Sequence, residues 1–321
     1  MQIPIRFLVL LITSSYHAIA TVFDNIKYKP PGQLIDVGGY KLHLYSQGVG
    51  NVTVVIEHSL GGLDGYFLIE KIAKITRVCI YDRAGYGWSE SSPKKRCSEE
   101  IVRELDTLLS RGGIEPPYIL VGNSFGSYNV RLYAHYFPEK IAGIVLTDGL
   151  YETEMLKMSP MLIGLKVFFI SGFLMSIIGS ILGIIRLLSN IGIFELLKKE
   201  LCNFNSQILR KVKRSFCSYQ HWLTMCREMW NLNLSAHQAS KANNLGNIPI
   251  ISIKAATFIR RTLWSFYMPL KTADRLRDKM HAELLQLSTN SIQLQATKSS
   301  HFVWVDEPEI IVSAIQQLLQ H

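Results

Sequence analysis

Short apolar runs bounded by turn residues alternate with amphipathic stretches along the first half of the chain. The runs rich in β-branched residues, which predict buried strands, are 52–57, 77–81, 118–121 and 141–147. The stretches with apolar positions at helical spacing are 66–75, 99–111 (with Ser98 as the expected N-cap) and 125–137. Strands that alternate with helices predict an α/β fold, in which right-handed crossovers connect the strands of a mostly parallel sheet.

Two further segments flank this pattern. Residues 33–37 and 40–46 alternate around Gly38-Gly39, which predicts a β-hairpin. The strand–helix alternation stops after Asp148 and resumes at Ile248, with strands expected at 248–253 and 291–296 and helices at 272–287 and 308–320. The interval between Asp148 and Ile248 has a helical pattern. We expect it to be inserted after the sixth strand, over the carboxyl edge of the sheet, where α/β folds bind ligands.

These patterns divide the 321 residues into three parts. Residues 1–29 form an N-terminal signal or membrane anchor with a linker, residues 30–150 and 248–321 form the α/β core, and residues 151–247 form a helical, apolar cap. The first part has Arg6 before an apolar core at 7–12 and ends in Ala18-Ile19-Ala20, which is the layout of a secretory signal. Cleavage and retention as an anchor both remain open, and we expect a membrane-associated or exported protein.

A second apolar stretch, 167–185, contains no charged residue and is long enough to cross a membrane. Gly172, Gly179 and Gly183 interrupt it, and Lys166 and Arg186 bracket it. A membrane span here would separate the last strands from the sheet. We therefore expect a cap helix that is buried or lies on a membrane, with a span as the alternative.

Composition narrows the expected partners. Hydrophobic residues make up 48% and charged residues 18%, so part of the surface is expected to meet lipid, a protein partner or an apolar ligand. The net charge is +9, with one basic cluster at 210–214. No zinc-finger spacing or RNA-binding signature accompanies that cluster, so nucleic-acid binding is not expected. A surface that faces anionic lipid and a solvated basic face both fit the charge.

The chain has five cysteines and no CxxC pair, which argues against a disulfide framework and against a zinc site. A bond between Cys217 and Cys226 in an oxidising compartment and free thiols at both positions remain open.

The motif that carries chemistry is Gly122-Asn123-Ser124-Phe125-Gly126. It follows a predicted strand and opens a predicted helix, which places Ser124 at a sharp turn. A serine hydroxyl becomes nucleophilic when a rigid turn presents it to a base, and flanking glycines let the strand pass closely into the helix.

The expected base is His301, on a short loop between the last strand and the terminal helix. In a parallel sheet that loop lies at the same carboxyl edge as the turn with Ser124. The expected acid is Asp148, which ends the next strand of the sheet and would fix the tautomer of the imidazole. Glu152 and Glu154 are weaker candidates on the following loop.

The acid of such a site often follows a later strand, but no acidic residue occurs between Ile248 and Asp274, which lies in a charged helical pattern. The oxyanion formed during acyl transfer needs backbone N–H donors, for which we expect Phe125 and Leu60. Leu60 lies in the glycine-containing loop after the strand at 52–57. His58, in the same loop, is expected to be structural.

Together these pieces resemble the α/β-hydrolase fold superfamily. The matching segments are 57–62, 81–89, 122–126, 145–148 and the His301 loop with 306–309. The resemblance implies the order Ser, Asp, His along the chain, a mobile cap and no metal or cofactor. Two features depart from it: the loop reads His58-Ser59 where His-Gly is usual, and the acid follows the sixth strand instead of the seventh.

We therefore expect a serine hydrolase that cleaves a hydrophobic or lipid-like acyl ester through an acyl-enzyme. Its expected partners are a small hydrophobic acyl substrate and a membrane surface. Thioesterase, amidase or acyltransferase action on the same residues is one alternative. A catalytically silent protein of this fold that binds an apolar ligand or a partner is another.

Overall fold

An eight-stranded sheet forms the centre of the computed structural model, which describes residues 5–157, 159–258 and 270–320. The strands lie in the order β1-β2-β4-β3-β5-β6-β7-β8. β1 and β2 are antiparallel, whereas β3 to β8 run parallel to one another. The bounds are β1 Gln33–Asp36, β2 Lys41–Gln47, β3 Thr53–Glu57, β4 Arg77–Tyr81, β5 Tyr118–Asn123, β6 Ile141–Thr147, β7 Ile250–Ala255 and β8 Ser291–Ala296. The predicted α/β-hydrolase fold with a mostly parallel sheet is confirmed.

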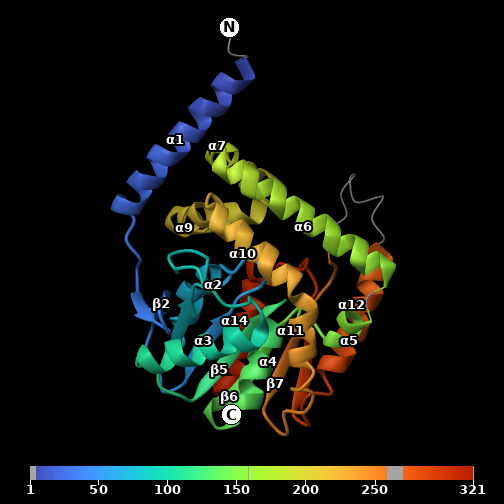
Figure 1. The fold of residues 1–321 in the computed structure, drawn as a ribbon. Helices are drawn as coiled ribbons and strands as arrows, with labels where there is room; N and C mark the ends of the chain where they lie inside the picture. Colours follow the sequence, from blue (N-terminus) through green and yellow to red (C-terminus); the bar gives the residue numbers. More distant parts are fainter. Residues whose placement is uncertain (1–4, 158, 259–269, 321) are drawn as a thin grey trace.

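Helices cover both faces of this sheet (Figure 1). Their bounds are α2 Gly65–Ile72, α3 Ser98–Arg111, α4 Gly126–Tyr136, α12 Leu270–Leu284, α13 Val303–Asp306 and α14 Pro308–Leu319, with a 3-10 turn at Pro138–Lys140. Alternate residues of a strand point to opposite faces, so Val54 and Ile56 pack with α2 and α14, whereas Val55 packs with α3 and α4. Both faces are therefore apolar, which explains the continuous apolar runs in the sequence.

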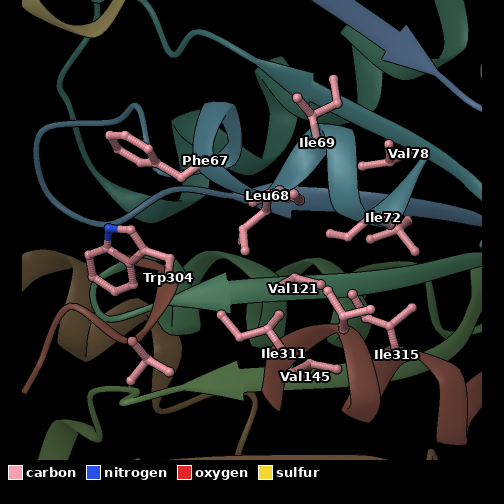
Figure 2. Close-up of a cluster of buried hydrophobic side chains, with 14 of the residues drawn as sticks. Phe67, Leu68, Ile69, Ile72, Val78, Val121, Val145, Trp304, Ile311 and Ile315 are labelled. Carbon is pink, nitrogen blue, oxygen red and sulfur yellow. The ribbon is translucent and has the colours of Figure 1, made fainter. Parts of the chain in front are cut away.

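One of the two cores lies between α2 and α14 (Figure 2). Leu68 and Ile72 of α2 meet Ile311 and Ile315 of α14 over Val121, and none of these side chains is exposed. Burial of this kind is the main favourable contribution to folding.

The insertion between β6 and β7 is helical in the part that the structure describes. Its elements are α5 Glu152–Leu156, α6 Pro160–Ile181, α7 Ile184–Asn190, α8 Ile193–Leu197, a 3-10 segment Lys199–Asn203, α9 Ser206–Phe216, α10 Tyr219–Trp230 and α11 Leu232–Ala239. Phe173 of α6 and Met225 of α10 pack on Tyr86, which follows β4. Ala236 of α11 packs on Phe125, which follows β5. The insertion therefore lies over the carboxyl ends of these strands.

One local prediction was wrong. Ser98 is the first residue of α3 and not its N-cap, which is Cys97. The free N–H groups of this helix end are instead satisfied from α11, since Ser98 N–H donates to Ser235 Oγ (3.1 Å) and Glu99 N–H to Gln238 Oε1 (3.0 Å). Because these hydrogen-bond acceptors come from a helix far along the chain, the sequence near the start of α3 gives no sign of them.

The stretch 167–185 is not one buried helix. α6 ends at Ile181, Gly183 adopts a left-handed conformation (φ +75°), and α7 begins at Ile184. One stripe of α6, which includes Phe173, is buried against α10, while Phe168 and Met175 on its other faces are 63% and 68% exposed.

We predict that Leu68→Ala lowers the free energy of unfolding by about 3 kcal/mol, because it leaves a cavity in a close-packed core. Leu34→Ala, at a side chain that is 45% exposed, is the matched control and should cost less than about 1 kcal/mol. Urea unfolding followed by circular dichroism measures both. Equal losses in the two variants would contradict the packing described for α2.

Candidate active site

The turn between β5 and α4 holds Ser124 in a strained conformation. Its φ is +51°, which is uncommon for a residue with a side chain. Both glycines of the motif are needed for close approach: a Cβ at Gly126 would lie 2.4 Å from the carbonyl oxygen of Glu57, and a Cβ at Gly122 would lie 2.6 Å from Val130 Cγ2. The sequence therefore builds a sharp turn that presents the Ser124 side chain at the end of the strand.

Three predicted residues meet at this turn. His301 Nε2 lies 2.9 Å from Ser124 Oγ, and His301 Nδ1 lies 2.5 Å from Asp148 Oδ2. The three residues come from the ends of β5 and β6 and from the loop after β8. Since Asp148 accepts at Nδ1, the neutral imidazole carries its proton there and turns an unprotonated Nε2 toward the serine hydroxyl.

The Asp148 carboxylate is 2% exposed and has further partners. Its Oδ1 accepts from Ala255 N–H (3.2 Å), from His281 Nε2 (3.1 Å) and from the Arg277 guanidinium. Burial alone would raise the pKa of Asp148, but the hydrogen bonds from His281 and His301 and the charge of Arg277 hold this pKa well below its usual value. Asp148 is therefore ionised at neutral pH.

Leu60, in the loop after β3, is the second predicted source of a backbone N–H. Leu60 packs in one cluster with Phe125, and among the described residues neither of their N–H groups has a hydrogen-bond partner. The loop is fixed by Asp64, which accepts from Ser59 N–H (2.5 Å) and from Ser59 Oγ (2.8 Å). Serine at position 59, where the resemblance leads one to expect glycine, thus holds this loop in place.

A buried arginine connects that loop to the cap. Arg83 donates to the carbonyl oxygens of His58 (2.8 Å) and Ser59 (2.7 Å) and to Glu57 Oε1 (2.9 Å). It also forms a two-point ion pair with Glu228 of α10, at 2.9 and 3.0 Å. Burial would lower the pKa of Arg83, but Glu228 and Glu57 hold it well above its usual value. The guanidinium is therefore a charged tie between the loop after β3 and the cap.

Apolar side chains surround the serine and the histidine. Leu60 packs against Phe173, Met225 and Met229 from α6 and α10. The His301 ring contacts the rings of Phe258 (5.2 Å), Phe302 (5.8 Å) and Trp304 (5.9 Å). Ser124 is itself 7% exposed. Its surroundings suit an apolar group better than a charged one.

The alternative acids lie elsewhere or are already engaged. Glu152 is buried and forms an ion pair with Arg131, at 2.7 and 3.2 Å. Asp274 accepts from Phe258 N–H (3.2 Å) and pairs with Arg277 (3.3 Å). The side chain of Glu154 lies outside the described residues.

His58 is held by the backbone. It contacts the Tyr81 carbonyl oxygen through Nε2 (2.7 Å), and its Nδ1 accepts from Gly65 N–H (3.0 Å). Burial lowers its pKa, so the ring is kept neutral as a structural group.

Sequence reasoning missed three partners of the site: Arg277, His281 and Glu228. Arg277 and His281 lie on α12, where the charged pattern gave no sign that they face Asp148. Glu228 is fully buried, although it lies in a helix with exposed polar positions. The available signal for Glu228 was that it is the one acidic residue among the aromatic and sulfur-containing residues of α10.

Among the described residues no group of three or more His, Cys, Asp or Glu side chains could hold a metal ion, and all five cysteines are free.

Comparison with protein families agrees with the fold. Residues 52–178 match the family described as alpha/beta hydrolase fold. This segment includes the loop after β3, Ser124 and Asp148, and it ends within α6.

Relatives of known sequence match parts of the chain. The uncharacterized protein YbdG of Bacillus subtilis (strain 168) is 29% identical over 153 residues, which are 46% of this chain and 47% of that protein. An AB hydrolase superfamily protein of Gibberella zeae (strain PH-1) is 25% identical over 76% of this chain and 78% of its own length. An uncharacterized vacuolar membrane protein of Saccharomyces cerevisiae (strain S288c) is 30% identical over 32% of this chain and 17% of its own length. The matched region thus spans less than half of the length of the first curated relatives.

Solved structures match nearly the whole chain. The epoxide hydrolase CorEH is similar with a TM-score of 0.64 and 14% identity, over 90% of this chain and 98% of that one. The enol-lactonase of Burkholderia xenovorans LB400 is similar with a TM-score of 0.61 and 15% identity, over 90% of this chain and 100% of that one. At these identities the likeness concerns the fold.

The lowered pKa of Asp148 predicts a pH-dependent contribution to stability. The contribution is complete above the unfolded-state pKa of about 3.9 and is lost as pH falls through the lower pKa of the folded state. Asp148→Asn should lower the free energy of unfolding by about 3 kcal/mol at pH 7, because it leaves Arg277 and His281 without their acceptor.

The difference in free energy of unfolding between the unchanged protein and Asp148→Asn should shrink as pH falls below about 4. Urea unfolding between pH 7 and pH 3 measures it, with Asp278→Asn, at a side chain that is 60% exposed, as the control. A difference that grows toward low pH would contradict the sign of this shift.

Proposed function

Because the chain belongs to the α/β-hydrolase fold superfamily, we propose that it is a serine hydrolase that cleaves a hydrophobic acyl ester through an acyl-enzyme. The observation that carries the proposal is the pair of contacts around His301: Ser124 Oγ to Nε2 at 2.9 Å and Asp148 Oδ2 to Nδ1 at 2.5 Å. A nucleophile, a base and an orienting acid in this arrangement are what acyl transfer requires.

In the proposed first step, His301 Nε2 takes the proton of Ser124 as Oγ attacks the acyl carbonyl carbon. Asp148 stabilises the imidazolium that forms. The imidazolium then gives its proton to the leaving alcohol, and the acyl group stays on Ser124. Water repeats the sequence through His301 and releases an acid.

The tetrahedral intermediate places a negative charge on the former carbonyl oxygen. The N–H groups of Phe125 and Leu60 are the proposed donors to this oxygen. Their freedom from other partners supports this role, as does the fixed position of the loop that carries Leu60. One donor comes from the start of α4 and the other from the loop after β3.

The chemistry of Ser124 favours an acyl substrate over an epoxide, although one similar structure is named an epoxide hydrolase. A serine oxygen that opened an epoxide ring would form an ether, which water does not cleave under mild conditions. The first turnover would then be the last. An acyl-serine ester is cleaved by activated water, so the same residues can turn over. The similarity to an enol-lactonase is consistent with an ester bond as the target.

The apolar side chains around Ser124 support a hydrophobic acyl group. The route to the serine would lie between the cap (151–247) and the core (30–150 and 248–321). Thioesters, amides and acyl transfer to another acceptor are alternatives on the same residues, and a panel of esters, thioesters and amides with matched acyl chains separates them. A catalytically silent protein that only binds an apolar ligand would not need the Ser124–His301 contact.

We also propose that the protein is associated with a membrane through α1 (Ile5–Lys27). Two described helical segments, Phe7–Lys27 and Leu162–Ile181, are long and apolar enough to cross a membrane by length and composition. The polar face of α1 points inward: Arg186 of α7 contacts His17 (3.2 Å), Thr21 (3.0 Å) and Asp24 (2.6 Å).

The outward face of α1 is apolar. Phe7, Leu11, Val22 and Ile26 are each more than half exposed. A helix that hides its polar side and exposes its apolar side suits contact with lipid. The exposed apolar faces of α6 would then lie on the surface of the same membrane. The buried stripe of α6 would keep this helix packed against α10.

We predict that a fluorophosphonate probe labels Ser124 with one probe per chain, because the contact with His301 raises the nucleophilicity of the hydroxyl. Ser124→Ala should abolish labelling and esterase turnover. His301→Ala should slow labelling by at least about a hundredfold. Intact-protein mass spectrometry measures the result, with Ser110→Ala, at an exposed position of α3, as the control. Folded protein that takes up no probe would favour the silent binder.

We predict that the full chain stays in the membrane fraction after carbonate extraction, because α1 exposes its apolar face to lipid. A variant that lacks residues 2–20 should be released by carbonate, since α6 alone would hold it only at the membrane surface. Immunoblotting of pellet and supernatant measures both. Release of the full chain would contradict the proposed anchor, and retention of the shortened variant would favour a span by α6.

A further inference from the structure

A cavity of about 720 Å³ lies between the second half of α1 and the cap helices α7 to α9. Figure 1 shows α1 beside α7, with α9 below them. The wall from α1 is largely apolar and includes Ile19 and Phe23, whereas the opposite wall carries the basic side chains of α9. The cavity has the size of a small-molecule site, and it is separate from the Ser124 site.

The charges that line this cavity do not balance. Of its five cations, Arg186 pairs with Asp24 and Lys213 pairs with Glu195. The remaining cations, Lys27, Arg210 and Arg214, have no carboxylate partner among the described residues.

Two of the three unbalanced cations lie at the ring of Tyr28, and the third, Arg214, donates to Asn25 Oδ1 (2.7 Å) and lies against Trp88. Lys27 Nζ and Arg210 Cζ lie 5.5 Å and 5.4 Å from its ring centre, and Arg210 also donates to its hydroxyl group (3.1 Å). Arg214 lies 5.0 Å from the ring of Trp88, whose N–H donates to the Tyr28 carbonyl oxygen (3.3 Å). Cations held together without a counter-charge favour an anion between them.

We propose that this cavity binds an anionic phospholipid, with its phosphate on Lys27, Arg210 and Arg214 and an acyl chain along Ile19 and Phe23. The inference rests on the proposed membrane association of α1. If α1 lies in lipid, its last turns lie at head-group level, which is where the three cations are. An apolar wall next to a cationic one matches a molecule that has a chain and a phosphate.

The cavity lies next to a close contact between α1 and the cap. A Cβ at Gly183 would lie 2.4 Å from the carbonyl oxygen of Thr13, so only glycine fits where α7 begins. A lipid in the cavity would fill the space that opens below this contact and would join α1 to α9.

The test uses the full chain in a neutral detergent. Short-chain phosphatidylglycerol is titrated in, and the shift in unfolding temperature gives its affinity. Phosphatidylcholine with the same acyl chains and inorganic phosphate are titrated in parallel. We expect phosphatidylglycerol to bind at least about tenfold more tightly than either.

The variant Lys27→Gln/Arg210→Gln should bind phosphatidylglycerol at least about tenfold more weakly. The control Lys74→Gln/Lys95→Gln removes the same charge at exposed residues that do not line the cavity, and it should bind as the unchanged protein does. An equal loss in the control, or equal affinity for the two lipids, would overturn the proposal. Inorganic phosphate that binds as well as phosphatidylglycerol would replace the lipid with a free anion.

Fluorophosphonate labelling of the same samples keeps the two proposals apart. Intact labelling without a preference for phosphatidylglycerol would sink the lipid site alone. A preference for phosphatidylglycerol without labelling would sink the hydrolase and leave the lipid site. Because the titration is done in detergent, it does not depend on how the chain partitions into membranes.

Discussion

A single buried carboxylate, that of Asp148, joins the parts of the molecule that make up the candidate active site. It follows β6, accepts a backbone N–H from the end of β7, and takes hydrogen bonds from two side chains of α12 and from His301 after β8. With a 2% exposed side chain and several donors, it stays charged and fixed. The orientation of His301, and with it the state of the Ser124 hydroxyl, depends on this arrangement.

The second constraint is steric. The turn at Ser124 works because a Cβ at Gly126 would clash with the carbonyl oxygen of Glu57 at the end of β3, and a Cβ at Gly122 would clash with Val130 of α4. The loop after β3, which carries Leu60, is in turn held by Arg83, and Arg83 is held by Glu228 of the cap. Docking of α10 and the geometry around the serine are therefore linked through one guanidinium. Movement of this part of the cap would break a buried ion pair, which is costly when one partner is left alone.

Much of this could be predicted from the sequence because it is local. The apolar runs 77–81 and 141–147 gave the bounds of β4 and β6, since these strands are apolar on both faces and end at a turn, and the alternating segment 291–296 gave those of the edge strand β8. The rule that parallel strands share a carboxyl edge was enough to bring Ser124, Asp148 and His301 together from positions far apart along the chain.

What the sequence did not reveal depends on contacts between distant elements. Arg277 and His281 belong to a helix with an ordinary charged pattern, and only its packing on β7 turns them toward Asp148. For α6 the sequence left a buried helix and a membrane-lying helix open, because an apolar run alone does not distinguish a helix packed in protein from one that faces lipid. In α1 the distinction comes from Arg186, which draws the polar side of the helix inward.

The central claim is that Ser124 carries the acyl group during turnover. Acid quenching during hydrolysis of a p-nitrophenyl acyl ester, followed by mass spectrometry of the protein and of its peptides, tests this most directly. We expect one acyl group per chain on the peptide that contains Ser124, with a burst of p-nitrophenol of the same stoichiometry. Steady hydrolysis with no acyl group on Ser124, or with the acyl group on another residue, would contradict it.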